Sequence, residues 1–486
     1  MSQFRSTVVR CMLVLLRLSP RRCDVFAAGG RPFPRKRRDR GLDRLTARRA
    51  RTVMPAVSPA DPPIPERVAV AVIGGGVVGV FAALLLAERG VSVAVFEKGR
   101  VAAEQSSRNW GWIRKQGRDL AELPLMIEAS ALWERVAGAL DADVGFGRRG
   151  VTYLIETEAE EADRAAWLDR ARPFQLDSRM LSAAETAALL GREDRAFRGA
   201  LHTPSDATAE PRLAVPAVAR RLRALGGHVL EGCAVRGLDR AAGRVAGVVT
   251  ERGRVKCDAA ILAGGAWSRT FLENFGLSLP QLAVVSSALR TQPLPRVAPG
   301  GVGAAGAAFR RRADGGYTLA RTGAARLDLT PAAFAHLRAF APTALSAREI
   351  LRVRVGRSFF GPLGRRRWTE DEVSPFERWR VLDPAPEDRL LDDVLASAAR
   401  LHPQLRGALA VERWAGLIDV TPDEVPVIDR VAEIPGLVVA TGCSGHGFGL
   451  GPGIGRLAGE LATGAAPCVD PTPFRRARFA RAARAA

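Results

Sequence analysis

The chain has 486 residues, more than one hydrophobic core usually supports, so we expect two structural domains or one large two-lobed unit. Apolar residues make up 47% and charged residues 25% of it, proportions that suit a globular protein able to bury a large cofactor. The net charge of +21 suggests a nucleic-acid-binding protein. However, residues 1–65 hold 15 lysines and arginines against 4 acidic residues, a net charge of +11. The remaining positive charge is spread thinly over the rest of the chain, which argues against a nucleic-acid-binding surface.

The cysteines and the apolar runs bear on metals, disulfides and membranes. No two of the six cysteines form a CxxC pair, and no two histidines stand at a metal-ligand spacing. We therefore expect no metal site, no disulfide scaffold and a reducing compartment. No apolar run reaches 18 residues, so we expect no transmembrane helix and a cytoplasmic location.

Residues 1–65 are basic, rich in Arg, Pro and Ala, and show little periodicity, so we expect them to be disordered. The favoured interpretation of residues 1–53 is a disordered extension or a mis-assigned start, with Met54 as the start of the chain proper. The Arg-rich, acid-poor composition leaves a targeting peptide open as the alternative.

The first predicted elements form a strand–helix–strand unit. Residues 68–73 are a continuous apolar run, typical of a buried parallel strand. Residues 77–89 have the pattern of an apolar helix that ends at Gly90, and residues 91–96 that of a second strand. Together they predict one βαβ unit.

Further elements follow along the chain. Residues 120–140 predict a helix with Leu123, Ile127, Leu132 and Trp133 turned inward. A capping box opens a predicted helix at 182–190. Other helices are expected at 212–225, 387–401 and 450–463, and strands at 151–156, 228–231, 234–239, 244–250, 258–263 and 435–441. An Arg-rich region of strands and loops is expected over about 280–380.

A glycine motif stands between the first predicted strand and helix. Gly74, Gly76 and Gly79 have the G-x-G-x-x-G spacing, which allows a tight turn, close approach of the backbone to a pyrophosphate, and close helix–strand packing. The phosphates would then lie at a helix N-terminus, where N–H groups attract anions. Glu97 ends the second strand, where a carboxylate accepts hydrogen bonds from a ribose and repels a 2′-phosphate. The pattern predicts a dinucleotide site that also takes in Val77, Val78 and Lys98.

Three later segments favour FAD over NAD as the bound dinucleotide. They are SSRNWGWIRKQGRD at 106–119, LAGGAWS at 262–268 and TGCSGHGFGLGPGIG at 441–455. With the first glycine motif, they resemble the D-amino-acid-oxidase-like superfamily of FAD-dependent oxidoreductases, which includes glycine and sarcosine oxidases, D-amino-acid dehydrogenases and γ-glutamylputrescine oxidases. The resemblance covers residues 68 to about 465.

The resemblance implies a set of contacts to FAD. Ser106, Ser107, Arg108 and Asn109 are expected to cover the pyrophosphate and flavin, with a capped surface loop as the alternative. Val235 is expected at the adenine, and Gly264, Gly265 and Trp267 near the ADP moiety, with a plain strand-to-helix turn as the alternative. The C-terminal motif is expected to bring a helix N-terminus to the flavin, with contacts from Gly445, His446, Gly447, Gly449, Leu450 and Gly451. Backbone N–H groups of Gly449, Leu450 and Gly451 would stabilise negative charge on the flavin.

Two departures from the family pattern concern the cofactor link and the substrate. Several relatives hold FAD covalently through a Cys before a T-P-D motif; here Thr421-Pro-Asp423 is present, but Gly416 stands at the aligned position. The loop in which other relatives use a His contains Trp110 and Trp112. We therefore expect non-covalent FAD. In sarcosine oxidases a Lys often follows the SGHGF motif, whereas Gly449 stands here, which disfavours a simple N-methyl glycine.

The resemblance implies oxidation of the C–N bond of an amine or amino acid by hydride transfer to flavin N5, with oxygen or a quinone as electron acceptor. Arg114 is the candidate anchor for a substrate carboxylate, the alternative being a surface or FAD-contacting arginine. His446 is expected either to face the flavin or substrate, or to brace its loop. Two other functions stay open: an FAD oxidase acting on a modified RNA base, and a non-enzymatic FAD-dependent assembly or scaffold protein.

The expected fold class is α/β, a Rossmann-type FAD-binding domain with an antiparallel-sheet (α+β) substrate domain. The FAD-binding domain is expected to comprise residues 66–150, 201–278 and 411–465, the substrate domain residues 151–200 and 279–410, and a basic tail residues 466–486.

Overall fold

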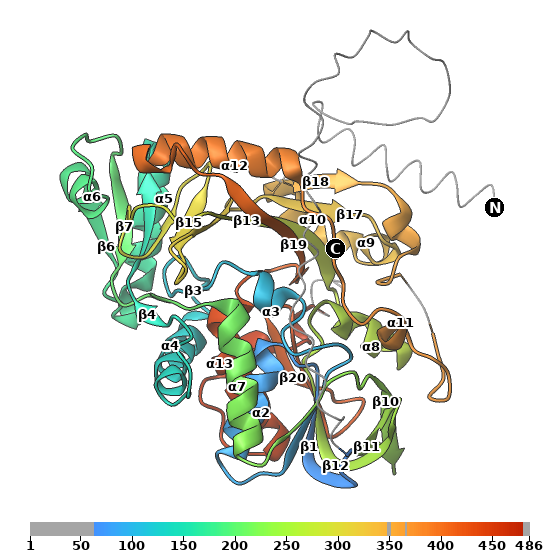
Figure 1. Ribbon diagram of the computed structural model, residues 1–486. Helices are drawn as coiled ribbons and strands as arrows, with labels where there is room; N and C mark the ends of the chain where they lie inside the picture. Colours follow the sequence, from blue (N-terminus) through green and yellow to red (C-terminus); the bar gives the residue numbers. More distant parts are fainter. Residues whose placement is uncertain (1–62, 348–350, 365–366, 480–486) are drawn as a thin grey trace, which may run out of the picture. The chain divides into compact units, whose positions relative to one another are not determined.

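The computed structural model describes residues 63–347, 351–364 and 367–479 (Figure 1). The expectations for residues 1–62 and 480–486 lie outside this range. Two large sheets and one small sheet organise the described residues.

The first sheet has eight strands among the described residues and contains the predicted βαβ unit. Strand β1 (Arg67–Ile73) lies between two parallel partners, β2 (Val93–Phe96) and β12 (Gly253–Leu262), and helix α2 (Val77–Ala87) connects β1 to β2. The other strands are β9 (His228–Leu230), parallel to β2, and β21 (Leu437–Thr441), parallel to β12. Three strands pair antiparallel with their neighbours: β10 (Val235–Ala241), β11 (Arg244–Thr250) and β20 (Val427–Arg430), the last of them with β21.

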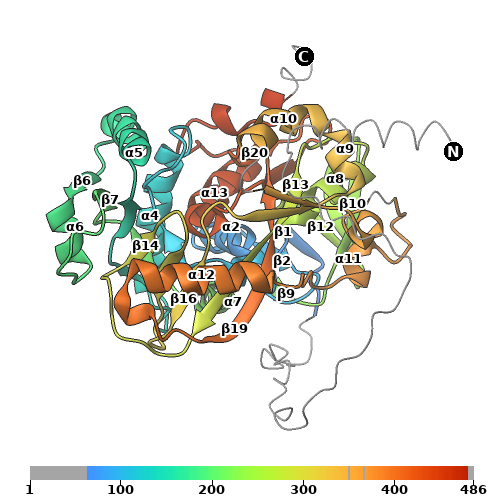
Figure 2. The same ribbon diagram turned by 90° about the horizontal axis from the view of Figure 1, so that it is seen from above.

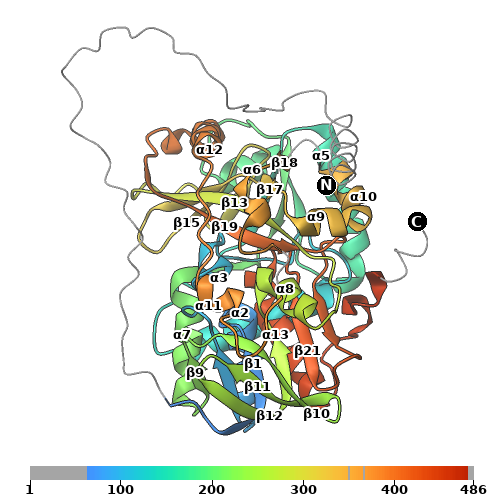
Figure 3. The ribbon, with the colours of Figure 1, turned by 90° about the vertical axis from the view of Figure 1, so that its right-hand side faces the viewer.

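Both faces of this sheet are covered, which explains why its central strands are continuous apolar runs. Val70 and Val72 face a core shared with α2, α4 (Leu123–Gly138), α7 (Pro211–Ala224) and α13 (Gly447–Thr463). Ala71 and Ile73 face the opposite core, shared with α8 (Ser268–Asn274) and α11 (Pro375–Arg378), which lie above β10 and β12 in Figure 3.

The second sheet has ten strands among the described residues and is mainly antiparallel. The long strands β13 (Leu282–Thr291) and β19 (Ala410–Val420) pair along their whole lengths at its centre. Helix α12 (Asp388–Leu401) packs on one face through Leu391, Val394 and Ala398 (Figure 2). The remaining strands are β5 (Val151–Ile155), β6 (Arg179–Ser182), β7 (Gly199–Thr203), β14 (Gly301–Gly303), β15 (Ala308–Arg311), β16 (Tyr317–Ala320), β17 (Ala325–Asp328) and β18 (Leu351–Arg354).

Short elements complete the fold. The third sheet consists of β3 (Trp112–Ile113), β8 (Ala207–Thr208) and β4 (Gly147–Arg148). In the sequence, each of these short strands stands between a strand of one large sheet and a strand of the other. The other helices are α3 (Gln105–Arg108), α5 (Glu158–Ala171), α6 (Ala183–Leu189), α9 (Pro331–Ala335) and α10 (Leu337–Ser346), and the 3-10 helices are η1 (Arg172–Phe174), η2 (Gly265–Trp267), η3 (Arg357–Phe360), η4 (Pro403–Leu405) and η5 (Thr472–Phe474).

Helix α13 packs unusually close to its neighbours, because glycines face them. A β-carbon on Gly451 would lie 2.6 Å from Val77 of α2, and one on Gly455 would lie 2.6 Å from the backbone nitrogen of Ala82. A β-carbon on Gly453 would lie 2.7 Å from the Leu125 carbonyl oxygen of α4. These glycines therefore let the three helix backbones approach one another, and this contact fixes where α13 begins.

The predicted α/β fold is confirmed, and most predicted elements form within a few residues of their expected bounds. One orientation was wrong: Ile127 is 39% exposed, whereas Leu123, Leu132 and Trp133 are buried as expected. The helix begins at Leu123 rather than at residue 120. Ile127 then falls on the outer face of α4, because the helix places its inward positions at Met126, Ala129 and Ser130.

Some segments join a different sheet from the one that the expected domain bounds imply. Strand β19 joins the second sheet, although residues 411–420 were expected in the FAD-binding segment, and its Leu417 and Asp419 line the cavity described below. Strand β7 likewise carries the second sheet to Thr203, past the expected change at residue 201. Within the expected 279–410 segment, Leu363, Trp368, Phe376 and Leu382 pack against the first sheet instead.

The described part of the C-terminal segment is not a tail. Phe474 is 1% exposed and belongs to the core that contains α2 and α13. Arg476 and Arg478 form ion pairs with Glu433 and Asp423. At the other end, Ile64 packs against the first sheet, although it lies within the segment 1–65 that was expected to be disordered.

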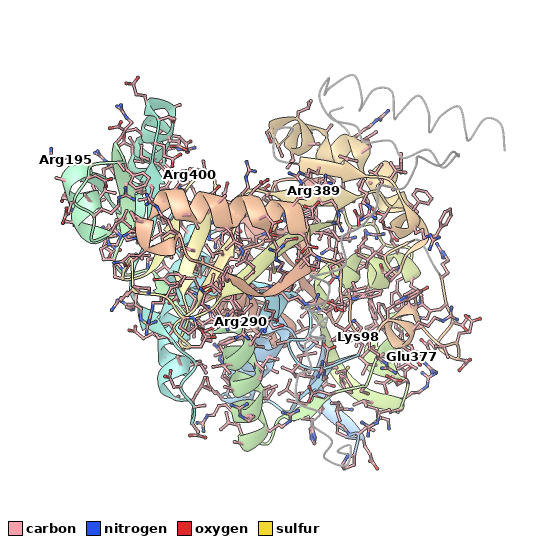
Figure 4. All side chains as sticks on the ribbon, turned by 45° about the horizontal axis from the view of Figure 1, so that its top comes forward. Lys98, Arg195, Arg290, Glu377, Arg389 and Arg400 are labelled. Atoms are coloured by element: carbon pink, nitrogen blue, oxygen red, sulfur yellow. The ribbon has the colours of Figure 1, made fainter. Side chains whose placement is uncertain are left out.

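The arginines are spread over several elements. Arg389 and Arg400 lie on α12, Arg195 follows α6, and Arg290 lies on β13, well apart in Figure 4. Arg290 forms ion pairs with Asp314 and Glu412. In the described residues, no helix is both long enough and apolar enough to cross a membrane.

The packing of α2 on β1 gives a first prediction. A β-carbon at Gly79 would lie 2.0 Å from the Gly74 carbonyl oxygen, which backbone atoms cannot accommodate without opening the turn. We expect Gly79→Ala to lower the free energy of unfolding by about 1–3 kcal/mol. The matched control is Gly138→Ala in α4, where no described atom lies within 4 Å and alanine is neutral or stabilising. Urea unfolding midpoints measure both, and equal midpoints would contradict the packing argument.

Candidate functional site

A cavity with about 1220 Å³ of space between atoms, partly open to solvent, lies at the carboxyl ends of β1, β2, β12 and β21. The N-termini of α2 and α13 both reach it. Predicted cofactor-binding residues that line it are Gly74, Gly76, Val77, Val78, Glu97, Lys98, Ser106, Asn109, Val235, Gly264, Gly265, Trp267, Gly445 and Gly447. The structure therefore brings together segments from five separate regions of the chain.

The first glycine turn has the close contacts that the motif predicts. Gly74 has φ +112°, and a β-carbon on it would lie 2.4 Å from the Ala263 carbonyl oxygen. A β-carbon on Gly76 would project to 3.1 Å from Ser106 Oγ. Gly79 does not line the cavity, because its close contact is with Gly74 and Val72. Its role is helix–strand packing, as the motif implies.

Glu97 holds the turn through two backbone groups. Its Oε2 accepts a hydrogen bond from Gly75 N at 2.8 Å, and its Oε1 accepts one from Gly99 N at 2.7 Å. Burial raises the pKa of Glu97, while the Lys98 charge and these two N–H groups oppose the rise. The carboxylate has further lone pairs, so it can still accept hydrogen bonds from a ribose.

The 104–109 segment has divided roles. Ser106 Oγ accepts a hydrogen bond from Val77 N at 2.9 Å, at the first turn of α2. Asn109 lines the cavity and braces its own loop, accepting from Gly111 N and donating to the Ser106 carbonyl. Gln105, which the sequence did not single out, also lines the cavity, and its buried Oε1 has no donor among the described residues.

Two predicted residues of this segment do not line the cavity in the described structure. Arg108 donates to the carbonyls of Ala415 and Ala103 and pairs with Asp383 at 3.2 Å. Ser107 donates to the Glu104 carbonyl oxygen. Both side chains of α3 are thus engaged by protein partners, and direct contacts of these two residues with the cofactor stay a prediction.

Lys98 links the cavity wall by hydrogen bonds to residues 379–380, a segment far along the chain. Its Nζ lies 2.6 Å from Glu104 Oε1 and donates to the carbonyls of Trp379 and Arg380. Glu104 also accepts from Leu382 N and from Trp267 Nε1. Sequence analysis missed Glu104, because no motif marks a carboxylate whose partners lie so far along the chain.

A second buried carboxylate organises the C-terminal motif and was also missed. Asp419, 6% exposed, accepts hydrogen bonds from Gly442 N at 2.7 Å and from Cys443 N at 3.3 Å. It also accepts from Thr441 Oγ1 and Gln281 Nε2. Burial raises the pKa of Asp419, against which these donors act. Its place two residues before Thr421 of the Thr421-Pro-Asp423 motif was the available signal.

The backbone N–H groups of α13 that are free to bind a cofactor differ from those expected for the C-terminal motif. Leu450 N already donates to the His446 carbonyl, so it is not free for a cofactor. Gly451 faces α2, and Gly449 faces Trp112 and Ile113. The N–H groups without an intrahelical acceptor belong to the first turn, at Gly447, Phe448 and Gly449. Gly447 and Phe448 line the cavity, so the available donors lie earlier in the motif than expected.

His446 lies between Gly445 and Gly447 and contacts Glu122 rather than the cavity. Its Nδ1 is 3.0 Å from Glu122 Oε2, and Glu122 is 0% exposed. Burial, reinforced by the Arg118 charge, lowers the pKa of His446 to about 4. Burial alone would raise the pKa of Glu122, but His446, Arg118 and Arg114 hold it below its usual value. Near neutral pH, Nδ1–H therefore donates to an ionised carboxylate, and Nε2 keeps its lone pair.

Arg114 is half-buried beside this pair. Its guanidinium lies 5.5 Å from the centre of the Tyr153 ring and donates to the Gln116 carbonyl oxygen. It does not line the described cavity. Trp112 and Tyr153 pack edge to face at 5.9 Å, so aromatic rings border the same region.

The arrangement suits an extended dinucleotide. Two helix N-termini present backbone N–H groups to one cavity, and their macrodipoles favour bound anions. Gly74 and Gly76 leave room for a ligand at the first of them, and Glu97 lies beside it. The unpartnered oxygen of Gln105 adds a polar group that a ligand would satisfy. The residues present therefore fit FAD.

The family follows from comparison with known proteins. The model of the DAO family, FAD-dependent oxidoreductases, matches residues 69–461. The chain belongs to this family of flavoenzymes, and the resemblance expected from the motifs is confirmed.

Individual relatives cover most of the chain. Glycine oxidase from Pseudomonas putida is 27% identical over 83% of this chain and 97% of its own length. Sarcosine oxidase subunit beta from Arthrobacter is 24% identical over 84% of this chain and 90% of its own. The structure of L-amino acid deaminase from Proteus myxofaciens, in complex with anthranilate, superposes with a TM-score of 0.82 at 32% identity, covering 87% of this chain and 96% of that protein.

The two hydrogen bonds of Glu97 generate a prediction. Glutamine at this position keeps the shape but replaces one acceptor by a donor that faces an N–H group. Since a charged hydrogen bond contributes about 1.5–3 kcal/mol, we expect Glu97→Gln to weaken FAD binding about tenfold or more. Titration of apoprotein, followed by flavin fluorescence, measures the dissociation constant. The control is Glu66→Gln, at an exposed position, and equal constants for the two variants would refute the role.

Proposed function

We propose that this flavoenzyme oxidises the C–N bond of an amine or amino acid, with FAD held in the cavity between the two helix N-termini. The observation that carries the proposal is the convergence of Gly74–Gly76, Glu97 and the first turn of α13 on one cavity. When bound, FAD supplies a hydride acceptor for the carbon next to nitrogen.

The chain's own residues would bind the cofactor along its length. The N-terminus of α2 would hold the pyrophosphate, Glu97 the ribose, and the backbone of Val235 the adenine. Gly264, Gly265 and Trp267 would flank the ADP moiety. The N–H groups of Gly447 and Phe448 would stabilise negative charge at the other end, as oxyanion-hole donors do.

At the substrate end, Arg114 would anchor a carboxylate, since a guanidinium can bind it in a bidentate manner. His446 is neutral near pH 7 and is held by Glu122, so it would orient its loop and offer Nε2 as a hydrogen-bond acceptor. Trp110 and Trp112, whose rings are 5.4 Å apart, would exclude water from the reacting atoms.

The electrons would pass to oxygen or to a quinone. The cofactor would be bound non-covalently, because the position aligned with the tethering Cys is Gly416. Glycine has no sulfur to form a thioether, and the end of the flexible Gln105 side chain takes the space beside it, 2.1 Å from where a β-carbon would lie.

Non-covalent binding predicts that denaturation releases the cofactor. We expect acid precipitation of the purified holoprotein to leave all the yellow colour in the supernatant, because no side chain bonds to the flavin. Absorbance of supernatant and redissolved pellet measures the partition. Colour that stays with the pellet would establish a covalent link.

The activity predicts anaerobic reduction of the bound flavin. We expect one or more amines or amino acids from a panel of both enantiomers to bleach its visible absorbance, with release of the imine hydrolysis product. Substrate-free holoprotein under the same illumination is the control. A chain that binds FAD but is bleached by none of the panel would favour the non-enzymatic scaffold instead.

A further inference from the structure

Residues 367–382 form a strap that leaves the second sheet and lies on the first. The strands before and after it along the chain, β18 and β19, both belong to the second sheet. Within residues 367–382, all of which the structure describes, a single short helix, α11, forms and no strand does. Trp368, Phe376 and Leu382 are nonetheless buried against a core of the first sheet. The strap therefore brings part of the expected substrate domain onto the FAD-binding domain.

The strap closes one side of the cofactor cavity. Phe376 lines the cavity, and its ring packs edge to face at 5.5 Å on that of Trp267, which lines it too. Lys98 is another lining residue, and its Nζ donates to the carbonyl oxygens of Trp379 and Arg380. This is the side at which the proposed function places the ADP moiety, so the strap borders that half of the cofactor.

Two ion pairs fasten the strap to the first sheet. Arg236 of β10 donates to Glu377 from Nε at 3.0 Å and from Nη2 at 2.8 Å. Arg380 donates from both Nη atoms to Glu251, directly after the end of β11. Figure 4 shows Glu377 on the same side of the molecule as Lys98. Neither arginine lines the cavity, so these pairs hold the strap without being part of the cofactor site.

The strap is the wall of the cavity that can open at the lowest cost. The strands β1, β2, β12 and β21 are joined by pairing, and α2 and α13 by close glycine contacts. In contrast, every hydrogen bond between the strap and the other described residues involves a side chain. Segments held in this way open locally at a lower free energy than paired strands do. FAD bound between the strap and the sheet can leave only after a wall moves.

We propose that the strap is the gate through which FAD enters and leaves the protein, and that the Arg236–Glu377 and Arg380–Glu251 pairs set how often it opens. This inference rests on the position of FAD in the proposed function, and it assigns the kinetics of cofactor exchange to residues that do not line the cavity. Since opening precedes both entry and exit, a looser strap raises both rate constants together and leaves the dissociation constant nearly unchanged.

The test measures FAD exchange in the full-length protein. The variants are Arg236→Gln, Arg380→Gln and the two combined. The control is Arg135→Gln on α4, whose guanidinium also makes two hydrogen bonds to one carboxylate, that of Glu88, on the opposite face of the first sheet. Stopped-flow quenching of flavin fluorescence by apoprotein gives the association rate constant. Recovery of that fluorescence after dilution of holoprotein gives the dissociation rate constant.

We expect each single substitution to raise both rate constants about threefold or more, since a bidentate, partly buried ion pair is stronger than an exposed one. The combined substitution should raise them by the product of the two factors. Dissociation constants should stay within about twofold of the unchanged protein's value. Arg135→Gln should leave all three constants unchanged. Hydrogen exchange in apoprotein peptides covering 367–382 should quicken by the same factors, which links the rate constants to opening of the strap itself.

Faster dissociation with unchanged association would make the strap an ordinary cofactor contact and would overturn the gate. Rate constants equal to those of Arg135→Gln would overturn it as well, and so would a lower melting temperature with faster hydrogen exchange throughout the first sheet. Failure of the oxidase function would appear separately, as holoprotein whose FAD exchange depends on the strap but whose flavin is bleached by no amine or amino acid.

Discussion

The close approach of α13 to α2 and α4 is the constraint on which the site depends. Gly451, Gly453 and Gly455 bring three helix backbones together, and Val77, the first residue of α2, is one of the contacts. The starts of α2 and α13 are therefore fixed relative to each other. Any side chain at these glycines would displace one helix N-terminus from the cavity that both of them border.

Buried carboxylates hold the walls around this pair of helices. Glu97 and Asp419 each accept two backbone N–H groups, and Glu104 is paired with Lys98. Since a carboxylate without partners is costly to bury, each of these loops has one favoured conformation. The walls are thus set by hydrogen bonds before a ligand binds, which is the preorganisation that a flavoenzyme needs.

The sequence predicted the parts of the fold whose signal is local. The βαβ unit, the glycine turn and Glu97 follow from hydrophobic period and fixed spacing, and they lie as expected. Arg108 and Leu450 illustrate the limit: a motif identifies the segment, but the direction of a side chain and the use of an N–H group depend on packing. The partners of Glu104 could not be predicted, because the segment at 379–382 returns to the first sheet through contacts that have no local pattern.

The cavity wall begins at Ile73 and ends at Phe448, with contributions from β12 and α11 between them. During synthesis, the first glycine turn emerges early, yet its facing helix is among the last elements to leave the ribosome. No N-terminal fragment that stops before α13 can enclose a ligand. The cavity is therefore complete only when the last of its walls, the first turn of α13, has been synthesised.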